Sequence, residues 1–184
     1  MRDNFGQCLE WLLDHEGGFV DHPNDPGGAT NLGVTRAVYE AWIGRRVSVD
    51  DMRALQRADV EPIYRAQYWD RVRADDLPAG IDWLVFDWAV NSGISTPAKA
   101  VQRSANARAD GAIGPKTVLA IHGADIPSLM LDLYDARADF YRRLSTFRTF
   151  GAGWMRRNRE TYLQAQRLHY SGTGGVNGRH DHSI

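Results

Sequence analysis

A stretch between two expected helices gathers side-chain oxygens beside one isolated glutamate. It reads DHEGGFVDHPNDPGGATNLGVT from residue 14 to residue 35, and two glycines follow Glu16 directly. The loop supplies five further polar side chains: Asp21, Asn24, Asp25, Thr30 and Asn31. Turn geometry alone explains such a composition, because Gly, Pro, Asn and Asp are common turn formers. The same side chains are also able to hold a water molecule or to place negative charge opposite Glu16.

Glu16 is expected at the carboxyl end of a helix, where the negative pole of the helix dipole disfavours another negative charge. Partial burial would act in the same direction, and both effects raise the pKa of a carboxyl group. A carboxylic acid that stays protonated near neutral pH is what the general acid of glycoside cleavage requires. Glu16 is therefore a candidate acid, and the alternative is an ordinary surface glutamate at a helix end.

The helix that positions Glu16 is predicted from the spacing of its apolar residues. Five of them recur at the i, i+3, i+4, i+7 and i+8 positions of one helix face: Phe5, Cys8, Leu9, Leu12 and Leu13. We expect a helix over residues 4–16 that ends at Gly17 and Gly18. Cys8, the single cysteine, has no partner for an internal disulfide and is expected to be a small buried side chain.

Capping residues mark the helices that follow. Thr35 is expected to cap a helix that runs to residue 43, and Ser48 with Asp51 a short one. Asp59 is the expected cap of a helix over VEPIYRAQYW, with Pro62 still in its first turn.

Residues 81–93, IDWLVFDWAVNSG, predict a central helix that is buried on every side, because apolar residues surround its axis. Beyond the first turn, its polar exceptions before Ser92 are Asp87 and Asn91, which share one strip of the helix. A carboxylate on such a helix is costly unless it is hydrogen-bonded or faces a polar cleft. Asp87 thus belongs either to a buried network or to the wall of a binding groove.

The rest of the chain also predicts helices. Thr96 with Pro97 and Gly114 with Pro115 mark two helix starts, and longer helices over residues 126–147 and 154–170 are expected to join around two glycines, Gly151 and Gly153. The segment 19–35 allows a short β-hairpin. The fold class is therefore mainly α, and the glycine-rich residues 171–184 are expected to form a flexible tail.

Composition narrows the class of protein. The 184 residues are 43% hydrophobic and 24% charged, as in an ordinary globular protein. We expect no membrane span, since no apolar run is long enough, and acids interrupt the N-terminus where a secretory signal needs an apolar core. The net charge of −1 combines −6 over residues 1–100 with +5 over residues 101–184. The basic half suits an anionic polymer, such as a cell wall or nucleic acid, or simply reflects solvated helix faces.

Other kinds of site find little support. DGAIGPKT lacks the spacing of a phosphate-binding loop, and no strand is expected before it. His180 and His182 are too few ligands for a metal site, and the loop acids do not match the EF-hand spacing. We expect no metal.

Several motifs, in this order along the chain, resemble the glycoside hydrolase family 108 lysozymes, which are N-acetylmuramidases of phage endolysin type. EGGFVDHPNDPGGATNLGVT is similar to the family pattern of Glu-Gly-Gly, then Asp-Pro-Gly-Gly, Thr and Gly-Ile-Thr. YWDRVRADDLP and FDWAVNSG continue the match, and QRSANARADGAIGPKTVLAI is similar to the small helical peptidoglycan-binding segment that usually follows. The resemblance covers residues 5–170.

The resemblance implies a lysozyme-like fold, with a catalytic lobe over residues 1–95 and a helical, peptidoglycan-binding lobe over 96–170. It makes Glu16 the catalytic acid. In the wider phage lysozyme fold an acid follows nine positions later, which fits Asp25, and a threonine lies beyond it. Thr30 is the nearest threonine but comes one position early, so Asp21 and Thr35 compete with it for a supporting role.

The resemblance also bears on substrate contacts. Tyr68 and Trp69 are able to stack on pyranose rings, although aromatic residues at helical spacing more often lie in the core. For Asp87, together with Asn91, the resemblance favours the wall of the sugar groove over a buried network.

The expected activity is hydrolysis of the β-1,4 bond between N-acetylmuramic acid and N-acetylglucosamine, with no cofactor. Bacterial peptidoglycan is the expected partner, without nucleic acid or stable membrane insertion. A lytic transglycosylase on the same bond and a non-catalytic wall-binding or secretion-associated module are the alternatives. Because no signal is seen, we expect the protein to stay cytoplasmic until a holin or an export system releases it to the periplasm or cell wall, as in a phage lysis protein. The alternative is a bacterial protein for wall remodelling or secretion-system assembly.

Overall fold

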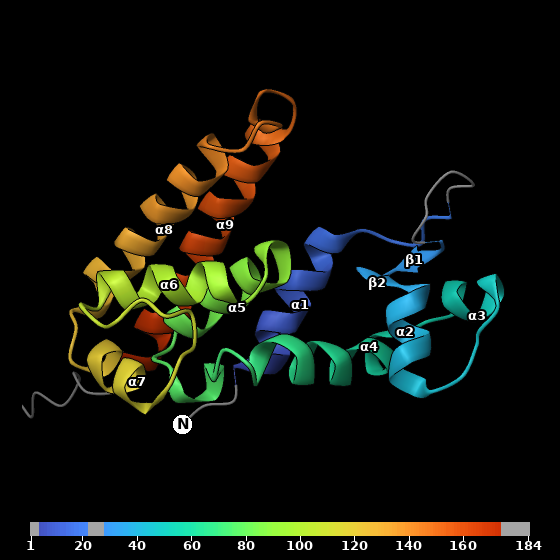
Figure 1. Ribbon diagram of the computed structural model, residues 1–184, viewed down its shortest axis with the longest axis horizontal. Helices are drawn as coiled ribbons and strands as arrows, with labels where there is room; N and C mark the ends of the chain where they lie inside the picture. The colour runs from blue at the N-terminus through green and yellow to red at the C-terminus, as the bar shows by residue number, and fades with distance from the viewer. Residues whose placement is uncertain (1–3, 22–27, 174–184) are drawn as a thin grey trace, which may run out of the picture. The chain divides into compact units, whose positions relative to one another are not determined.

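The computed structural model describes residues 4–21 and 28–173, which are mainly helical with one small sheet (Figure 1). The chain forms two compact units, residues 1–71 and residues 72–184. The predicted fold class, mainly α with a short hairpin near the N-terminus, is confirmed.

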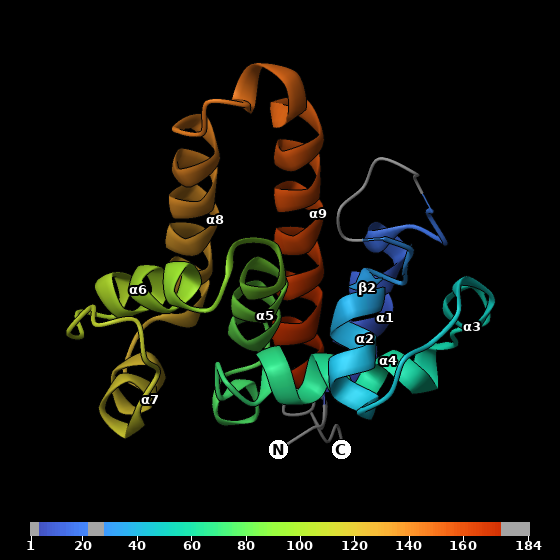
Figure 2. The ribbon, with the colours of Figure 1, turned by 45° about the vertical axis from the view of Figure 1, so that its right-hand side comes forward.

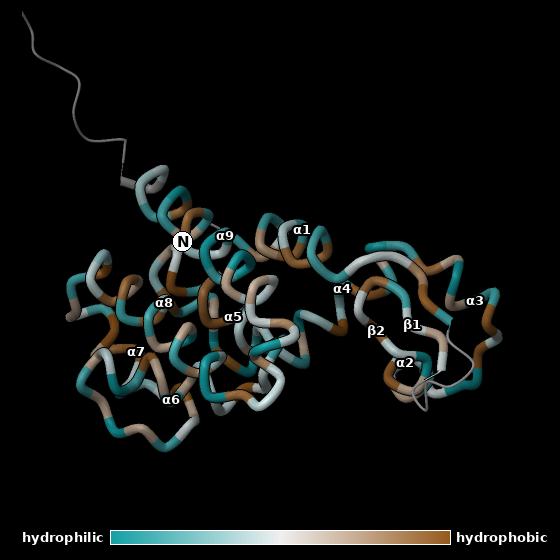
Figure 3. The backbone as a smooth tube through the Cα atoms, turned by 90° about the horizontal axis from the view of Figure 1, so that it is seen from above, coloured by the Kyte–Doolittle hydropathy of each residue, from teal (hydrophilic) through white to brown (hydrophobic). Residues whose placement is uncertain are grey.

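In the first unit, α1 (Phe5–Glu16) has the amphipathic face that its spacing predicts. Phe5, Cys8, Leu9 and Leu12 are buried, and the free thiol of Cys8 has no exposed surface. Figure 3 shows hydrophilic and hydrophobic residues alternating around the turns of α1, as expected for a helix with one buried face. The predicted helix over residues 4–16 and the buried cysteine are both confirmed.

The hairpin consists of β1 (Thr30–Asn31) and β2 (Val34–Thr35), which pair antiparallel with Thr30 opposite Thr35 and Asn31 opposite Val34. An isolated bridge joins Val20 to Thr30. The two residues of the turn both have positive φ, 50° at Leu32 and 74° at Gly33. Such turns match the twist of a two-residue hairpin, and they normally favour Gly or Asn at both places.

Three helices and one π-helical turn complete this unit: α2 (Arg36–Ile43), α3 (Val49–Arg53), α4 (Arg57–Tyr64) and η1 (Arg65–Trp69). The Thr35 hydroxyl caps α2 by accepting a hydrogen bond from the Val38 backbone N–H at 3.3 Å. Ser48 and Asp51 form the capping box of α3. The sequence predicts both of these caps correctly.

The predicted start of α4 is wrong. Gln56 is the N-cap, and Asp59 is the third helical residue, whose carboxylate accepts a hydrogen bond from the Gln56 backbone N–H at 2.7 Å. Because Asp59 completes a reciprocal capping box, the helix begins almost one turn earlier than expected. Pro62 therefore lies in the helix interior and not in its first turn.

The second unit contains η2 (Ala74–Asp76), α5 (Ile81–Ser92), α6 (Ser95–Ser104), α7 (Pro115–His122), α8 (Ile126–Arg142) and α9 (Phe147–Thr173). All nine residues from Ile81 to Ala89 are buried, so α5 is the central helix that its composition predicts. Figures 1 and 2 show α8 and α9 side by side as a helical hairpin, and α5 packs against both.

Three predicted helix boundaries in this unit are wrong. The helix expected over residues 126–147 is α8, which ends at Arg142. α9 begins at Phe147 and continues through Gly151 and Gly153, where a break was expected. A Cβ atom on the buried Gly151 would lie 2.7 Å from the Phe147 ring, so this glycine allows close packing and does not stop the helix. Likewise α6 begins at Ser95, and the Thr96 hydroxyl donates to the Ser92 carbonyl at 3.3 Å and does not cap the helix. The start at Gly114 and Pro115 is confirmed.

A buried ionic network joins three helices of the second unit at Asp87. One carboxylate oxygen accepts a hydrogen bond from Arg137 of α8 at 2.6 Å, and the other accepts from Arg157 of α9 at 2.7 Å. The Thr161 hydroxyl donates to the first oxygen at 3.3 Å. Burial alone would raise the pKa of Asp87, but the two guanidinium groups outweigh it and lower this pKa to about 2.

Replacement of Asp87 by asparagine should therefore strongly destabilise the protein. Arg137 is only 1% exposed and would lose its countercharge, which typically costs about 3–5 kcal/mol. The matched control is Asp139→Asn, because Asp139 pairs with Arg142 on the surface, where an ion pair contributes about 1 kcal/mol or less. Urea unfolding of both variants measures the difference, and equal losses of stability would contradict the assigned role.

Asp87 should also contribute to unfolding in acid. Its pKa is lowered in the folded protein, so the stability that it contributes is present above its ordinary pKa and is lost as the pH falls from about 4 towards 2. Urea midpoints between pH 5 and pH 2 should fall less steeply for Asp87→Asn than for the native chain. Parallel pH profiles would show that the carboxylate is not held ionised by its arginines.

Candidate active site

Glu16 is the last residue of α1, and its side chain is half-buried. Gly17 ends the helix with φ of 73°, a left-handed conformation that favours glycine. The glycine pair therefore leaves the Glu16 carboxyl group at the helix end, as the sequence predicts.

The turn of the β-hairpin lies against this carboxyl group. A Cβ atom built on Gly33 would be 3.0 Å from Glu16 Oε2 and 3.1 Å from Glu16 Cγ, and it would lie still closer to the Tyr64 hydroxyl. The carboxyl group and the hydroxyl thus occupy the space that a side chain at residue 33 would need. Glycine is required there by this crowding as well as by its positive φ.

Tyr64 holds the turn in place from α4. Its ring is buried, and its hydroxyl donates a hydrogen bond to the Leu32 carbonyl at 2.9 Å. Leu32 adopts a positive φ, which is unfavourable for a residue with a branched side chain. The hydrogen bond stabilises the backbone beside Glu16 in this conformation.

Sequence reasoning missed Gly33 and Tyr64. For Gly33 a signal existed in NLGV. A glycine inside a segment that allows a hairpin is able to take the positive φ that a two-residue turn requires. Tyr64 carried no such signal. An aromatic residue at helical spacing is indistinguishable from a core residue until the hairpin is placed beside it.

Asn31 and Thr30 have different environments on β1. Asn31 is buried, and its side-chain amide donates to the Met52 carbonyl at 2.9 Å and the Arg53 carbonyl at 3.2 Å, which ties the hairpin to α3. Thr30 is half-buried, and its backbone exchanges two 2.8 Å hydrogen bonds with Val20. Within residues 4–21 and 28–173, the Thr30 hydroxyl makes no hydrogen bond.

The structure describes only some of the other candidate residues of the loop. Asp25 and Asn24 lie outside the described residues, so the proposed second acid stays a prediction. Asp21 is exposed. Thr35, a competitor for the supporting role, has its hydroxyl engaged as the cap of α2.

The expected sugar contacts require correction. Trp69 is 1% exposed and packs edge-on against Phe5 at 5.2 Å between ring centroids, so it is a core residue and has no free face for a pyranose. Asp87 is fully buried in its arginine network and forms no groove wall. Tyr68 is half-buried, and Asn91 is exposed, with its amide donating to the Asp87 carbonyl at 2.6 Å. Both remain accessible to a ligand.

Other classes of site are not found in the part of the chain that the structure describes. It contains no group of three or more His, Cys, Asp or Glu side chains placed to hold a metal ion. None of its helices combines the length and the apolar character needed to cross a membrane.

Comparison with known proteins identifies two segments. Residues 9–93 match the family model described as glycosyl hydrolase 108, and residues 96–160 match the one described as a predicted peptidoglycan domain. The first match extends from the first compact unit into α5 of the second. A search of curated proteins found no match.

Among solved structures, SagA of Brucella abortus is 40% identical, with a TM-score of 0.78 over 90% of this chain and 95% of its own. An identity of 40% over most of both chains indicates more than a shared fold. The resemblance seen in the sequence and the expected enzyme class are both confirmed. The chain therefore belongs to the glycosyl hydrolase 108 family and is a lysozyme-like peptidoglycan hydrolase of the N-acetylmuramidase type.

Proposed function

We propose that Glu16 is the general acid with which this hydrolase cleaves the β-1,4 bond between N-acetylmuramic acid and N-acetylglucosamine. The observation that supports the role is the placement of its half-buried carboxyl group at the end of α1, beneath a turn whose residue 33 has no side chain. The turn limits the directions that the carboxyl group can take. Glu16 would transfer its proton to the glycosidic oxygen as the bond to the muramic acid anomeric carbon breaks.

A second group must complete the hydrolysis. We propose Asp25, whose carboxylate would activate the attacking water or stabilise the positive charge that develops on the sugar ring. The Thr30 hydroxyl, which makes no hydrogen bond within the described residues, would help to position the water. Carboxyl groups about 5 Å apart would favour a retaining mechanism and about 6.5–9.5 Å an inverting one. Neither route requires a metal or an organic cofactor.

We also propose that residues 1–95 carry the catalytic function and residues 96–170 hold the enzyme on the wall. Peptidoglycan lies outside the cytoplasmic membrane, so a holin or an export route would have to release the protein to it, as in a phage or prophage lysis protein. Cell fractionation before and after lysis would show whether the peptidoglycan-hydrolysing activity leaves the cytoplasmic fraction only when the cells lyse.

Glu16→Gln should abolish the clearing of purified peptidoglycan. Glutamine keeps the shape of the side chain but has no acidic proton to transfer, and loss of a general acid typically lowers the rate by a factor of about 10² to 10⁴. The matched control is Glu10→Gln, an exposed glutamate on the same helix. If Glu16→Gln clears peptidoglycan as fast as the native chain, Glu16 is not the acid.

Gly33→Ala should impair the same reaction without removing any catalytic group. The new methyl group would displace the Glu16 carboxyl or the Tyr64 hydroxyl, and misplacement of a catalytic group by about 1 Å can lower the rate by about 10²-fold. Gly18→Ala is the control, because nothing lies within 4 Å of its added Cβ atom and its φ is not positive. Kinetics at matched folded concentration compare the two, and equal activity would contradict the role given to the turn.

A further inference from the structure

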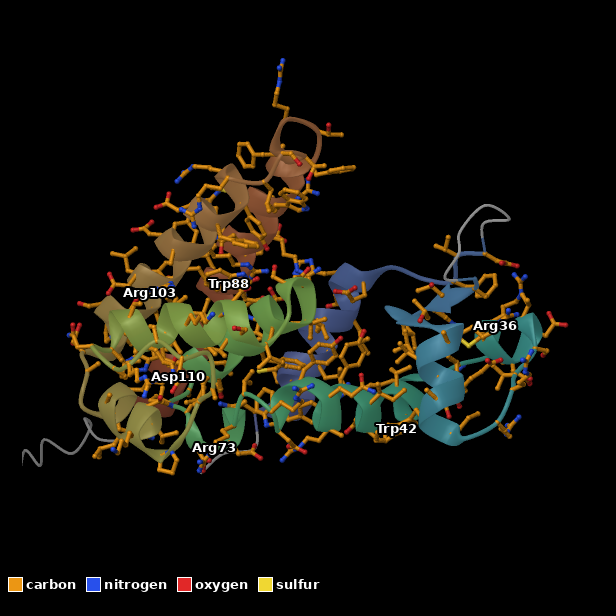
Figure 4. The ribbon with its side chains drawn as sticks, in the orientation of Figure 1. Arg36, Trp42, Arg73, Trp88, Arg103 and Asp110 are labelled. Carbon is orange, nitrogen blue, oxygen red and sulfur yellow. The ribbon has the colours of Figure 1, made fainter. Side chains whose placement is uncertain are left out.

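A surface pocket of the second unit gathers positive charge around an aromatic wall. It has a volume of about 380 Å³ and lies between α5, α6 and α8. Six of its lining residues matter here: Trp88, Lys99, Arg103, Asp139, Phe140 and Arg143. Figure 4 labels Trp88 and Arg103, which come from neighbouring helices.

The charges of this pocket are unbalanced. Among the described residues that line it, Lys99, Arg103 and Arg143 face one acid, Asp139, which already pairs at 2.8 Å with Arg142 outside the pocket lining. In the described part of the chain, none of the three cations has a carboxylate oxygen within 4.0 Å. A concave surface with excess charge of one sign concentrates ligands of the opposite sign.

Packing restricts one of these cations. The Lys99 side chain lies against the backbone of Gly111, where a built Cβ atom would be 3.1 Å from Lys99 Cε. Gly111 has φ of 89°, and the Gln102 side chain accepts a hydrogen bond from its N–H at 2.9 Å. Because Gln102 is fully buried, the loop that supports Lys99 is fixed from the core. The ammonium group therefore has less freedom to lose when a ligand binds.

Two aromatic rings, Trp88 and Phe140, belong to the pocket lining. The Trp88 ring is 2% exposed and lies 5.9 Å from the Phe140 ring. Cations around an aromatic wall suit a small ligand that combines carboxylates with methyl groups. A bulky hydrophobic ligand would form no ion pairs with these cations.

We propose that this pocket binds the stem peptides of peptidoglycan through their free carboxylates. Stem peptides are short, carry carboxylates along and at the end of the chain, and contain alanine methyl groups. All the cations of the pocket lie within residues 96–160, the segment that matches a predicted peptidoglycan domain. The identity of the ligand rests on the proposed peptidoglycan substrate, but the binding of carboxylates does not depend on Glu16.

The adjacent residues Arg142 and Arg143 provide a matched test. Each replacement by glutamine removes one exposed positive charge at the carboxyl end of α8, but only Arg143 lines the pocket. We expect Arg143→Gln to weaken binding to sacculi freed of phosphate polymers about fivefold to tenfold, and Arg142→Gln less than twofold. Cosedimentation at 4 °C in the Glu16→Gln background measures binding without digestion, and thermal melting checks the folding of each variant.

A second arm identifies the ligand. When an amidase has removed the stem peptides, the native chain should bind the remaining glycan more weakly, and Arg143→Gln should no longer differ from it. A soluble stem tetrapeptide should compete for binding better than inorganic phosphate at the same concentration.

Three outcomes would overturn the proposal: equal effects of the two arginine variants, a persisting Arg143 effect on peptide-free glycan, or stronger competition by phosphate. If Glu16→Gln still digests the wall while the Arg143 effect stands, only the assignment of the acid fails.

Discussion

The absence of a side chain at residue 33 is the constraint on which the geometry around Glu16, the proposed acid, depends. Gly33 combines a positive φ with contact to both the Glu16 carboxyl group and the Tyr64 hydroxyl. Three distant parts of the sequence, the end of α1, the hairpin turn and the end of α4, meet at this one position. The hairpin is only two residues per strand, so its own ladder stabilises it little. Its place is determined instead by the Tyr64 hydroxyl and by the Asn31 amide, which donate to backbone carbonyls of neighbouring segments.

The second unit depends on a different kind of interaction. Its central helix carries a carboxylate that two arginines neutralise, one from each helix of the α8–α9 hairpin. Such a network adds little net stability compared with an apolar core, but moving one helix away would leave a buried charge without its partner. Its function is therefore structural, and the chemistry assigned to the first unit does not draw on it.

Much of this fold follows from local patterns. The spacing of apolar residues predicts α1 and α5, and side-chain caps predict the starts of α2 and α3, because both signals act over a few residues. The predictions are wrong where a residue distant in the sequence determines the environment of a side chain. Nothing near Asp87 shows that its partners are Arg137 and Arg157, and nothing near Gly151 shows that the Phe147 ring will fill the space beside it.

In the candidate site, too, the residues predicted correctly are those with a local signal in the sequence. Glu16 is recognisable because the glycines that end its helix are its neighbours in sequence. For Trp69 the sequence leaves both a sugar contact and the core open, because the packing that decides between them is against Phe5, more than 60 residues earlier in the chain. Tyr64 was overlooked because its hydroxyl acts on a turn 32 residues away.

Mass spectrometry of the muropeptides released from purified peptidoglycan tests the central claim most directly. A hydrolase with Glu16 as its acid should release fragments with reducing N-acetylmuramic acid ends, and Glu16→Gln should release none above the blank. Fragments with 1,6-anhydro ends would instead reveal a lytic transglycosylase. Fragments with reducing ends from Glu16→Gln would contradict the assignment of the acid.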